Sequence, residues 1–170
     1  MNPLKERTLI LVKPDGVRRA LIGEVIARFE RVGLKVFGIK MVNPDRAFIE
    51  KHYPSSKEWT VGLGQKSLSD YEQYNLDPVE QVGTKDPYEV GKLVTGWLFD
   101  YMSSGPSVAI VFEGNQAVAM GRKIVGNTIP SFAPTGTIRG DFAKDSPILA
   151  NLRKRGVKNV VHASGSIEEA

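Results

Sequence analysis

A histidine close to the end of the chain is the first residue whose setting suggests chemistry. His162 follows the apolar pair Val160-Val161 and precedes the small residues Ala163 to Ser166. A histidine at a strand end with little bulk beside it is open to a ligand, and its imidazole is a good nucleophile near pH 7. A satisfied core histidine is the alternative. The only other histidine, His52, lies near an expected helix end, where a surface or capping role is favoured.

Cationic and hydrogen-bonding side chains gather at the ends of the expected elements. Lys13 ends the first expected strand, Arg122 lies on an expected helix, and Thr128 follows that helix. Arg139 stands among the small residues of Gly136-Thr137-Ile138-Arg139-Gly140-Asp141, which leave its guanidinium fork open to an anion. With an exposed histidine, these side chains are the inventory for binding a polyphosphate and moving a phosphoryl group.

Familiar phosphate-binding and hydrolytic motifs do not account for this chemistry. Gly62-Leu-Gly-Gln-Lys66-Ser67 looks like a phosphate loop, but no Gly precedes Lys66 and no expected strand leads into it. The run Gly91-Lys92-Leu93 fails because Leu93 cannot coordinate magnesium. The patterns G-x-G-x-x-G, G-x-S-x-G and H-E-x-x-H are absent. The basic run from Arg153 to Lys158 is either a solvated loop or a phosphate-attracting patch.

The apolar pattern predicts the elements that would hold these side chains. Thr8–Val12 and Ser107–Phe112 are near-continuous apolar runs, typical of buried strands. Alternation over Leu34–Val42 predicts a half-buried strand, and Val160-Val161 a last short one. Pro14-Asp15-Gly16 predicts a turn. Helical spacing predicts helices over residues 22–32, 45–53, 93–101 and 117–125, the first and last bounded by Gly33 and Gly126.

Two stretches lack this regularity. Ser55 to Val90 is rich in Gly, Ser, Asp and Pro, which predicts short helices and loops on the surface, one of them around Leu68–Tyr74. A loop is expected after Gly126. The order β-α-β, helical material, β-α-β favours an α+β fold: a ferredoxin-like αβ sandwich (βαββαβ) whose four-stranded antiparallel sheet is covered by helices. A doubly wound α/β sheet is the alternative, for which four strands are few.

Composition excludes several classes of protein. The 170 residues, 18.7 kDa, suit one domain, and 41% hydrophobic with 25% charged residues argues against wholesale disorder. The chain has no Cys, which excludes disulfides, thiolate metal sites and a Cys nucleophile. No apolar run approaches the ~20 residues of a membrane span, and Met1–Glu6 lacks the apolar region of a secretory signal. A cytoplasmic protein is expected. The net charge of +4 is compatible with a nucleic-acid partner, with nucleotides or with no anionic partner at all.

A series of short motifs points to one family. They are Glu6-Arg7-Thr8 leading to Val12-Lys-Pro-Asp-Gly-Val17, Met102-Ser-Ser-Gly-Pro106, Phe112-Glu-Gly114, Pro134-Thr-Gly-Thr-Ile-Arg-Gly-Asp-Phe142 and Asn159-Val-Val-His-Ala-Ser164. Occurring in this order, they resemble the nucleoside diphosphate kinases. The resemblance covers most of the chain outside about 55–90 and a shorter insert near 144–154. It implies a single kinase domain over residues 1–170 with an inserted segment at about 55–90.

The resemblance also implies a ping-pong reaction in which ATP donates its γ-phosphate to His162, and the phosphohistidine passes it to a nucleoside diphosphate. Mg²⁺ would arrive with the nucleotide and bridge its β- and γ-phosphates, so no metal-ligating side chain is assigned. By similarity, Lys13 would contact phosphate and the ribose 3′ hydroxyl. Of the others, Tyr53 would position the phosphate, Ser164 would lie close to His162, Arg122, Thr128 and Arg139 would hold phosphates, Asn159 would bond the ribose, and Leu98 would line the base slot.

Three departures from the family pattern stand out. The aromatic that stacks on the base is not placed, since Val94, Trp59 and Trp97 compete for it. The family's Glu that bonds the histidine would fall beyond Ala170, and Glu168 and Glu169 come too early. The middle residue of the family's Ser-Asp-Ser is here Gly165.

Partners and rival functions follow from the same features. Self-association as a hexamer or tetramer is implied, with no membrane and no specific nucleic acid as partner. An RNA-binding sheet is a rival class, but Val108 to Phe112 lacks an aromatic RNA-binding signature. A catalytically silent nucleotide-binding scaffold of the same fold is the remaining alternative, against which the intact Lys13, Arg122, Arg139 and His162 argue.

Overall fold

The computed structural model describes residues 5–170. Residues 1–4 of the Met1–Glu6 stretch, which lacks the apolar region of a secretory signal, lie outside the described residues. The chain forms two compact units. The first unit contains residues 5–43, 105–144 and 158–170, and the second contains residues 44–104 and 145–157.

The first unit is built on a four-stranded sheet in the order β2-β3-β1-β4. All three neighbouring pairs are antiparallel, so β1 and β2 run parallel to each other but are separated by β3. This arrangement confirms the ferredoxin-like α+β fold, and the all-antiparallel pairing excludes the doubly wound alternative. The strands are β1 (Glu6–Val12), β2 (Lys35–Val42), β3 (Ser107–Gly114) and β4 (Val161–Ala163).

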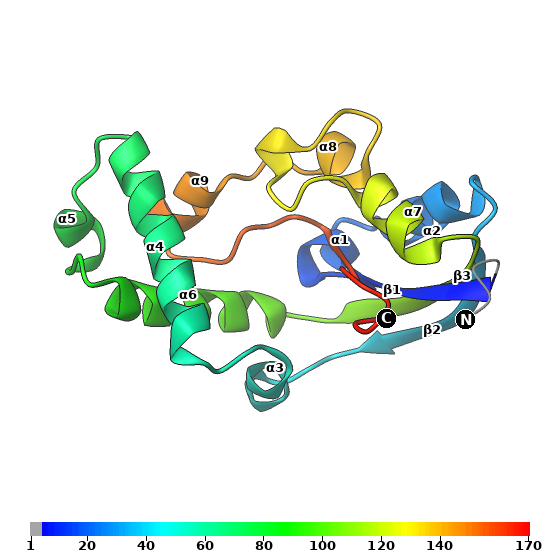
Figure 1. Ribbon diagram of the computed structural model, residues 1–170, viewed down its shortest axis with the longest axis horizontal. Helices are drawn as coiled ribbons and strands as arrows, with labels where there is room; N and C mark the ends of the chain where they lie inside the picture. The colour runs from blue at the N-terminus through cyan, green and yellow to red at the C-terminus, as the bar shows by residue number, and fades with distance from the viewer. Residues whose placement is uncertain (1–4) are drawn as a thin grey trace. The chain divides into compact units, whose positions relative to one another are not determined.

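Two helices cover one face of this sheet, α2 (Ile22–Glu30) and α7 (Ala117–Val125) (Figure 1). Their apolar faces join the alternate buried residues of β1 and β3 in one core, as the period-2 and helical spacings predict. Within it the rings of Phe29 and Phe112 stack with centroids 4.4 Å apart. The strand ends that carry the predicted site residues are therefore held by a packed layer on one side.

Short helices occupy places where the sequence predicts only turns or loops. The Pro14 turn opens α1 (Pro14–Arg18), because proline fits the first helical position. The stretch after Gly126 contains η2 (Pro130–Phe132) and α8 (Ile138–Phe142). In α8 the Thr137 hydroxyl accepts from the Gly140 N–H, which is a side-chain cap.

The second unit is helical. The longest helix in the described residues, α4, is a correction to the expectation of short surface helices and loops over 55–90. It spans 17 residues and begins where the Ser56 hydroxyl accepts from the Trp59 N–H. Similarly, α6 begins at Pro87 rather than near Gly91, capped by Asp86. The helices are α3 (Arg46–His52), α4 (Lys57–Gln73), α5 (Pro78–Val82), α6 (Pro87–Met102) and α9 (Pro147–Leu152).

Glycines explain why α4 gives a weak apolar signal. A Cβ at Gly64 would lie 1.8 Å from the Pro87 carbonyl oxygen, and one at Gly91 would lie 2.0 Å from the Thr60 carbonyl oxygen. The backbones of α4 and α6 therefore approach too closely for any side chain at these positions. The Gly62–Ser67 run lies inside α4, so it is not a phosphate loop.

Within residues 5–170, no helix is both long and apolar enough to cross a bilayer.

Candidate active site

Seven of the nine predicted site residues belong to the first unit. They come from the end of β1, from β4 and the residues that flank it, from the last turn of α7, from the following loop and from α8. Tyr53 and Leu98 belong to the second unit. The seven are Lys13, Arg122, Thr128, Arg139, Asn159, His162 and Ser164.

The predicted nucleophile lies in the middle of β4. His162 is exposed, whereas its neighbours Val161 and Ala163 are buried. It pairs with Leu11 across the β1–β4 ladder. Because side chains alternate along a strand, His162 projects from the face of the sheet opposite the α2–α7 core. The imidazole is thus carried by a paired strand and exposed on that face of the sheet.

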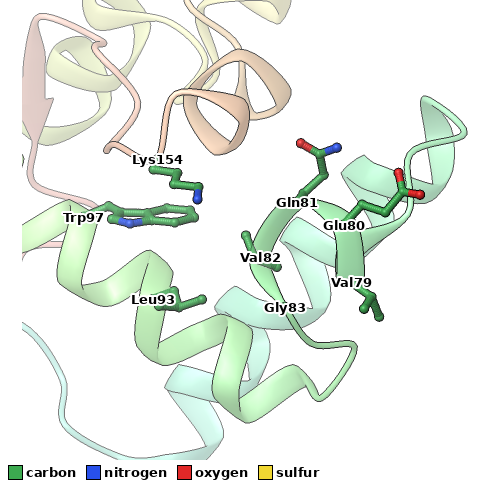
Figure 2. Close-up of a pocket in the computed structure, with 8 residues that line it drawn as sticks. All are labelled: Val79, Glu80, Gln81, Val82, Gly83, Leu93, Trp97 and Lys154. Atoms are coloured by element: carbon green, nitrogen blue, oxygen red, sulfur yellow. The ribbon is translucent and has the colours of Figure 1, made fainter.

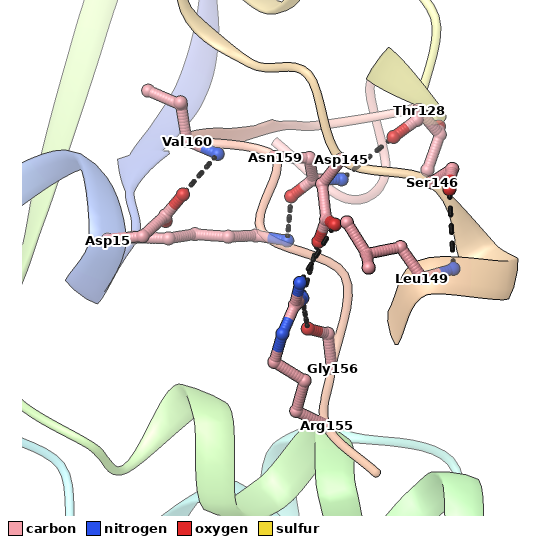
Figure 3. Close-up of polar contacts among 10 residues, drawn as sticks. Asp15, Thr128, Asp145, Ser146, Leu149, Arg155, Gly156, Asn159 and Val160 are labelled. Carbon is pink, nitrogen blue, oxygen red and sulfur yellow. Dashed lines mark hydrogen bonds and ion pairs between the residues drawn. The ribbon is translucent and has the colours of Figure 1, made fainter. Parts of the chain in front are cut away.

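A chain of hydrogen bonds joins the ends of β1 and β4 to the loop after α7. The Lys13 ammonium donates to Asn159 Oδ1 at 2.7 Å. Asn159 Nδ2 in turn donates to the Thr128 carbonyl at 2.9 Å, a bond drawn in Figure 3. Asn159 is buried and Lys13 is only 8% exposed. The structure therefore brings Lys13, Thr128 and Asn159 together three residues upstream of His162.

Arg139 is the most deeply buried of the predicted site residues with a charge, at 2% exposed. Its guanidinium donates to three backbone carbonyls: Val161 at 2.7 Å, Gly126 at 2.9 Å and, more weakly, Asn159 at 3.4 Å. These bonds fix the plane of the guanidinium and tie α8 to the segment that leads into β4. The residues beside Arg139 are small, as predicted, but its bonds to backbone were not foreseen.

Two further predicted residues take different positions. Ser164 is buried directly after β4, with its hydroxyl 3.4 Å from both the N–H and the carbonyl oxygen of Leu9. Arg122 is exposed in the last turn of α7. Ser164 thus fastens the strand that carries His162, whereas Arg122 presents its charge to solvent.

Burial gives Lys13 an unusual electrostatic state. Desolvation, and to a lesser extent the charge of Arg139, lower the pKa of Lys13 from 10.5 to about 8, although Asp15 acts in the opposite direction. The folded chain therefore holds this proton more weakly than the unfolded chain does. A bound anion would favour the ammonium form, which suits a site for phosphate.

We expect the Lys13→Met chain to be more stable than wild type at pH 7. The folding penalty of the buried ammonium is fully present below pH 8 and is released as the pH rises towards 10.5. This shift in the pKa of Lys13 corresponds to a penalty of about 3 kcal/mol in the free energy of unfolding. Loss of the hydrogen bond to Asn159 offsets about 1 kcal/mol, so Lys13→Met should gain about 2 kcal/mol of unfolding free energy. Urea unfolding at pH 7 and pH 10.5 checks this, since the gain should disappear at the higher pH.

A lysine on the surface supplies the control for that measurement. Lys123, on α7, is exposed. Its replacement by Met should change the free energy of unfolding by no more than about 0.5 kcal/mol at either pH. A Lys13→Met chain that is destabilised at pH 7 would show that the buried ammonium does not oppose folding.

The second unit holds the predicted tyrosine in an aromatic cluster. The Tyr53 ring lies 5.9 Å from that of Phe99 and 6.2 Å from that of Trp59, centroid to centroid. Burial raises the pKa of the Tyr53 hydroxyl. Leu98 is half-buried on α6. Trp59, a candidate for the base-stacking aromatic, thus packs against Tyr53.

Trp97, the other tryptophan considered for base stacking, lines a pocket of about 370 Å³ within the second unit (Figure 2). Leu93 shares the α6 side of this pocket, α5 forms another wall, and the Lys154 side chain lies above the indole (Figure 2). The lining residues are Val79, Glu80, Gln81, Val82, Gly83, Leu93, Trp97 and Lys154. The two tryptophans therefore have different surroundings, one in an aromatic cluster and one facing a pocket.

Comparison with known proteins decides the family. The profile of the nucleoside diphosphate kinase family matches residues 6–61 and 88–170. The chain belongs to the nucleoside diphosphate kinase family. It is therefore an enzyme of nucleotide phosphotransfer, and the resemblance stated from the motifs is confirmed. Residues 62–87, which hold most of α4 and all of α5, lie outside the matched ranges.

Individual relatives agree with this assignment. The chain is 51% identical to a nucleoside diphosphate kinase of Pyrobaculum aerophilum over 165 residues, covering 97% of this chain and 90% of the relative. It is 41% identical to one of Sulfurisphaera tokodaii, covering 97% of this chain and 83% of the relative.

Solved structures of the family also match. A crystal structure of an NDP kinase from Pyrobaculum aerophilum has a TM-score of 0.91 and 49% identity, covering 98% of this chain and 91% of that one. A transition-state mimic of the Borrelia burgdorferi enzyme, with bound vanadate and ADP, has a TM-score of 0.69 and 34% identity, covering 98% and 83%.

The sequence pattern did not reveal the contact between Asp15 and the backbone of Val160, which lies two residues before His162. It assigned Asp15 and Gly16 only to a turn, and Val160 only to a strand. In the structure Asp15 is buried, and it accepts a hydrogen bond from the Val160 N–H. The one available signal was an acidic residue directly between Pro14 and Gly16, close to Lys13, and it does not by itself identify a partner 145 residues away.

Proposed function

We propose that the chain is a nucleoside diphosphate kinase working by a ping-pong mechanism through His162. An imidazole nitrogen of His162 attacks the γ-phosphorus of ATP, the bond from that phosphorus to the β,γ-bridging oxygen breaks, and ADP leaves. In the second half-reaction a terminal phosphate oxygen of the acceptor diphosphate attacks the phosphorus, and the P–N bond breaks. The observation that carries the proposal is an exposed histidine on a strand that pairs with β1, close in the chain to a buried hydrogen-bond network that contains Lys13 and Arg139.

The proposed roles of the other residues follow their settings. Lys13 contacts phosphate and the ribose 3′ hydroxyl, which its lowered pKa supports because an anion would stabilise the buried ammonium. Asn159 bonds the ribose. Arg122, Thr128 and Arg139 act on the phosphates, Arg139 from a buried position that also orders the backbone around Asn159. Tyr53, Leu98 and Ser164 are proposed to position the phosphate, line the base slot and support His162.

Mg²⁺ enters the proposal as part of the substrate. Among the described residues, no group of three or more His, Asp or Glu side chains is arranged to hold a metal ion. A Mg²⁺ ion carried on the β- and γ-phosphates needs no such group, and it would neutralise charge as the phosphoryl group moves. The cations Lys13, Arg122 and Arg139 would supply the protein's own share of that neutralisation.

The experiment that tests the proposed function is phosphoryl labelling. The wild-type chain is mixed with Mg²⁺ and γ-labelled ATP, and quenched without an acceptor. We expect label on the protein that is acid-labile and base-stable, that transfers to added GDP, and that does not form when EDTA removes Mg²⁺. A chain that binds ATP and never takes label would instead support the silent scaffold, which the family comparisons do not favour.

Self-association is proposed through the edge strand β2. Phe37, Ile39 and Met41 of this strand are each more than half exposed, an unusual concentration of apolar surface for an edge strand. A second copy covering this surface would remove it from water. The proposed assembly is a hexamer or a tetramer, and sedimentation equilibrium would contradict it by showing only an 18.7-kDa species.

The two units are proposed to form one kinase domain, and the chain is proposed to work in the cytoplasm. Both units contain residues matched by the family profile, which supports their working as one kinase domain over residues 1–170. A cytoplasmic location is proposed as well, where ATP and nucleoside diphosphates are available. The chain has no Cys, so a reducing compartment leaves its covalent structure unchanged.

A further inference from the structure

The residue two positions before His162 has a strained backbone. Val160 has φ +67°, in the left-handed region, and its side chain is 0% exposed. The Val161 N–H donates to the Asn159 carbonyl at 2.7 Å, which closes a γ-turn with Val160 at its centre. A β-branched residue in this region is an outlier, because its side chain crowds the backbone. Such strain persists only where the surroundings impose it.

The start of α1 imposes this conformation from both sides of Val160. Asp15 Oδ2 accepts from the Val160 N–H at 3.2 Å (Figure 3), and the Lys13 N–H donates to the Val160 carbonyl at 2.8 Å. Asp15 is only 6% exposed. At Gly16 a Cβ would lie 2.9 Å from the Val160 carbonyl oxygen, so the absence of a side chain there is what lets the two segments meet.

The residues around Val160 are those of the proposed mechanism. Asn159 precedes it and bonds the Lys13 ammonium, and His162 follows two positions later. A rotation of the Val160 backbone towards the extended region would therefore change the direction of the chain between Asn159 and His162. A misplacement of about 1 Å between reacting groups can cost about 100-fold in rate.

We propose that Asp15 is a positioning residue for phosphoryl transfer. Its carboxylate holds Val160 in the left-handed γ-turn, and that turn aims Asn159 at Lys13 and sets the entry of His162 into β4. The inference rests on the proposed function, because it assigns Asp15 a task only if His162 is the residue that accepts the phosphoryl group.

The test is a double-mutant cycle between Asp15 and Val160, read by single-turnover phosphorylation of His162 at saturating MgATP. Asp15→Ala should lower the rate about 30-fold. Glycine adopts φ > 0 without a steric penalty. In a Val160→Gly chain the left-handed conformation therefore depends less on the Asp15 carboxylate. In that background Asp15→Ala should lower the rate no more than about threefold. An equal loss in both backgrounds would overturn the proposal.

Val160→Ala controls for the lost side chain. Alanine removes most of the buried valine but keeps the Cβ that disfavours the left-handed region. Asp15→Ala should therefore cost about 30-fold in the Val160→Ala background, as it does with valine present. If alanine and glycine at this position protect the enzyme equally, volume rather than backbone conformation is responsible, and the proposal fails.

Glu6 controls for a purely structural role. It too is a buried carboxylate that accepts a backbone hydrogen bond, with Oε1 2.8 Å from the Val118 nitrogen, and it lies at the opposite end of β1 from Lys13. Glu6→Ala should lower Tm as Asp15→Ala does but leave the phosphorylation rate within about twofold of wild type. If both variants slow the reaction in proportion to their loss of Tm, Asp15 acts through stability alone.

The cycle remains informative if Asp15→Ala does not fold. Asp15→Asn keeps an oxygen acceptor of the same shape, so it should slow phosphorylation about threefold with valine at 160 and not measurably in the Val160→Gly chain. Equal effects in the two backgrounds would overturn the proposal here too. Wild type without label would refute the proposed function, whereas labelled wild type with an unimpaired Asp15→Ala chain would refute only the positioning role.

Discussion

Replacing His162 by alanine should abolish phosphorylation of the chain. The imidazole is the only group proposed to form a bond to phosphorus, so its removal leaves no covalent intermediate for either half-reaction. We expect the rate of γ-phosphate transfer from ATP to GDP to fall by at least about 10³-fold, with ADP affinity kept within a few-fold. Rapid-quench labelling and a coupled transfer assay measure the two effects, and equilibrium titration with ADP measures the affinity.

The second histidine provides a matched control. His52 ends α3 and its ring lies edge-on to that of Tyr53, with centroids 5.2 Å apart. His52→Ala should still take the label and should transfer it to GDP at a rate within about threefold of wild type, since the lost contact is one aromatic pair. If the label persists in His162→Ala and is lost in His52→Ala, the nucleophile is His52 of the second unit, and the proposal is wrong.

The second large effect is expected at Arg139, even for the charge-conserving change to lysine. A lysine ammonium is a point charge and cannot reproduce a planar fork that reaches three carbonyls. We expect Arg139→Lys to lose about 3 kcal/mol of unfolding free energy, because carbonyls of buried segments would lose their donor. Phosphorylation of His162 should slow about 100-fold as the backbone around Asn159 and Val161 loosens. Urea unfolding and single-turnover labelling check the two effects.

Arg28 is the matched arginine for this comparison. It also makes several contacts, to the Gly136 carbonyl and to the carboxylates of Glu24 and Asp141, but its side chain is more accessible than that of Arg139. Arg28→Lys should cost no more than about 1 kcal/mol and leave the labelling rate nearly unchanged, because partly exposed ion pairs contribute little. If Arg28→Lys and Arg139→Lys lose equal unfolding free energy and labelling rate, then neither the burial of Arg139 nor its bonds to three carbonyls explains the effect.

Much of the first unit could be predicted because its patterns are periodic. Alternation in β1 and β3 and the helical spacing in α2 and α7 follow from burial of one face of each element. The short motifs single out Lys13, Arg139 and His162 as candidate site residues, but the loop expected around Arg139 is helix α8, and His162 lies within β4 rather than at a strand end. Motif order also gave the family, which the comparisons confirm.

Helix α4 and the backbone around Val160 could not be predicted, for two different reasons. In α4 the contact with α6 is made by backbone at Gly64 and Gly91, so the apolar stripe that marks an ordinary helix is weak. Val160 is a strand-forming type, and nothing in a Val-Val-His run indicates a positive φ. The bonds of Arg139 to backbone carbonyls were equally hidden, because residue types do not record which backbone groups lack partners.

The second unit is formed by two separate segments of the chain, and this affects the order in which the protein folds. Its first segment, residues 44–104, contains the α4–α6 pair, whose contacts are close in sequence. The other segment, residues 145–157, is synthesised only after β3, α7 and α8. Its Asn151, on α9, accepts a hydrogen bond from Ser67 on α4, which lies 84 residues earlier in the chain. Contacts of such separation close long loops and form slowly. During synthesis the helical pair can therefore assemble early, while α9 docks on it only after most of the sheet has left the ribosome.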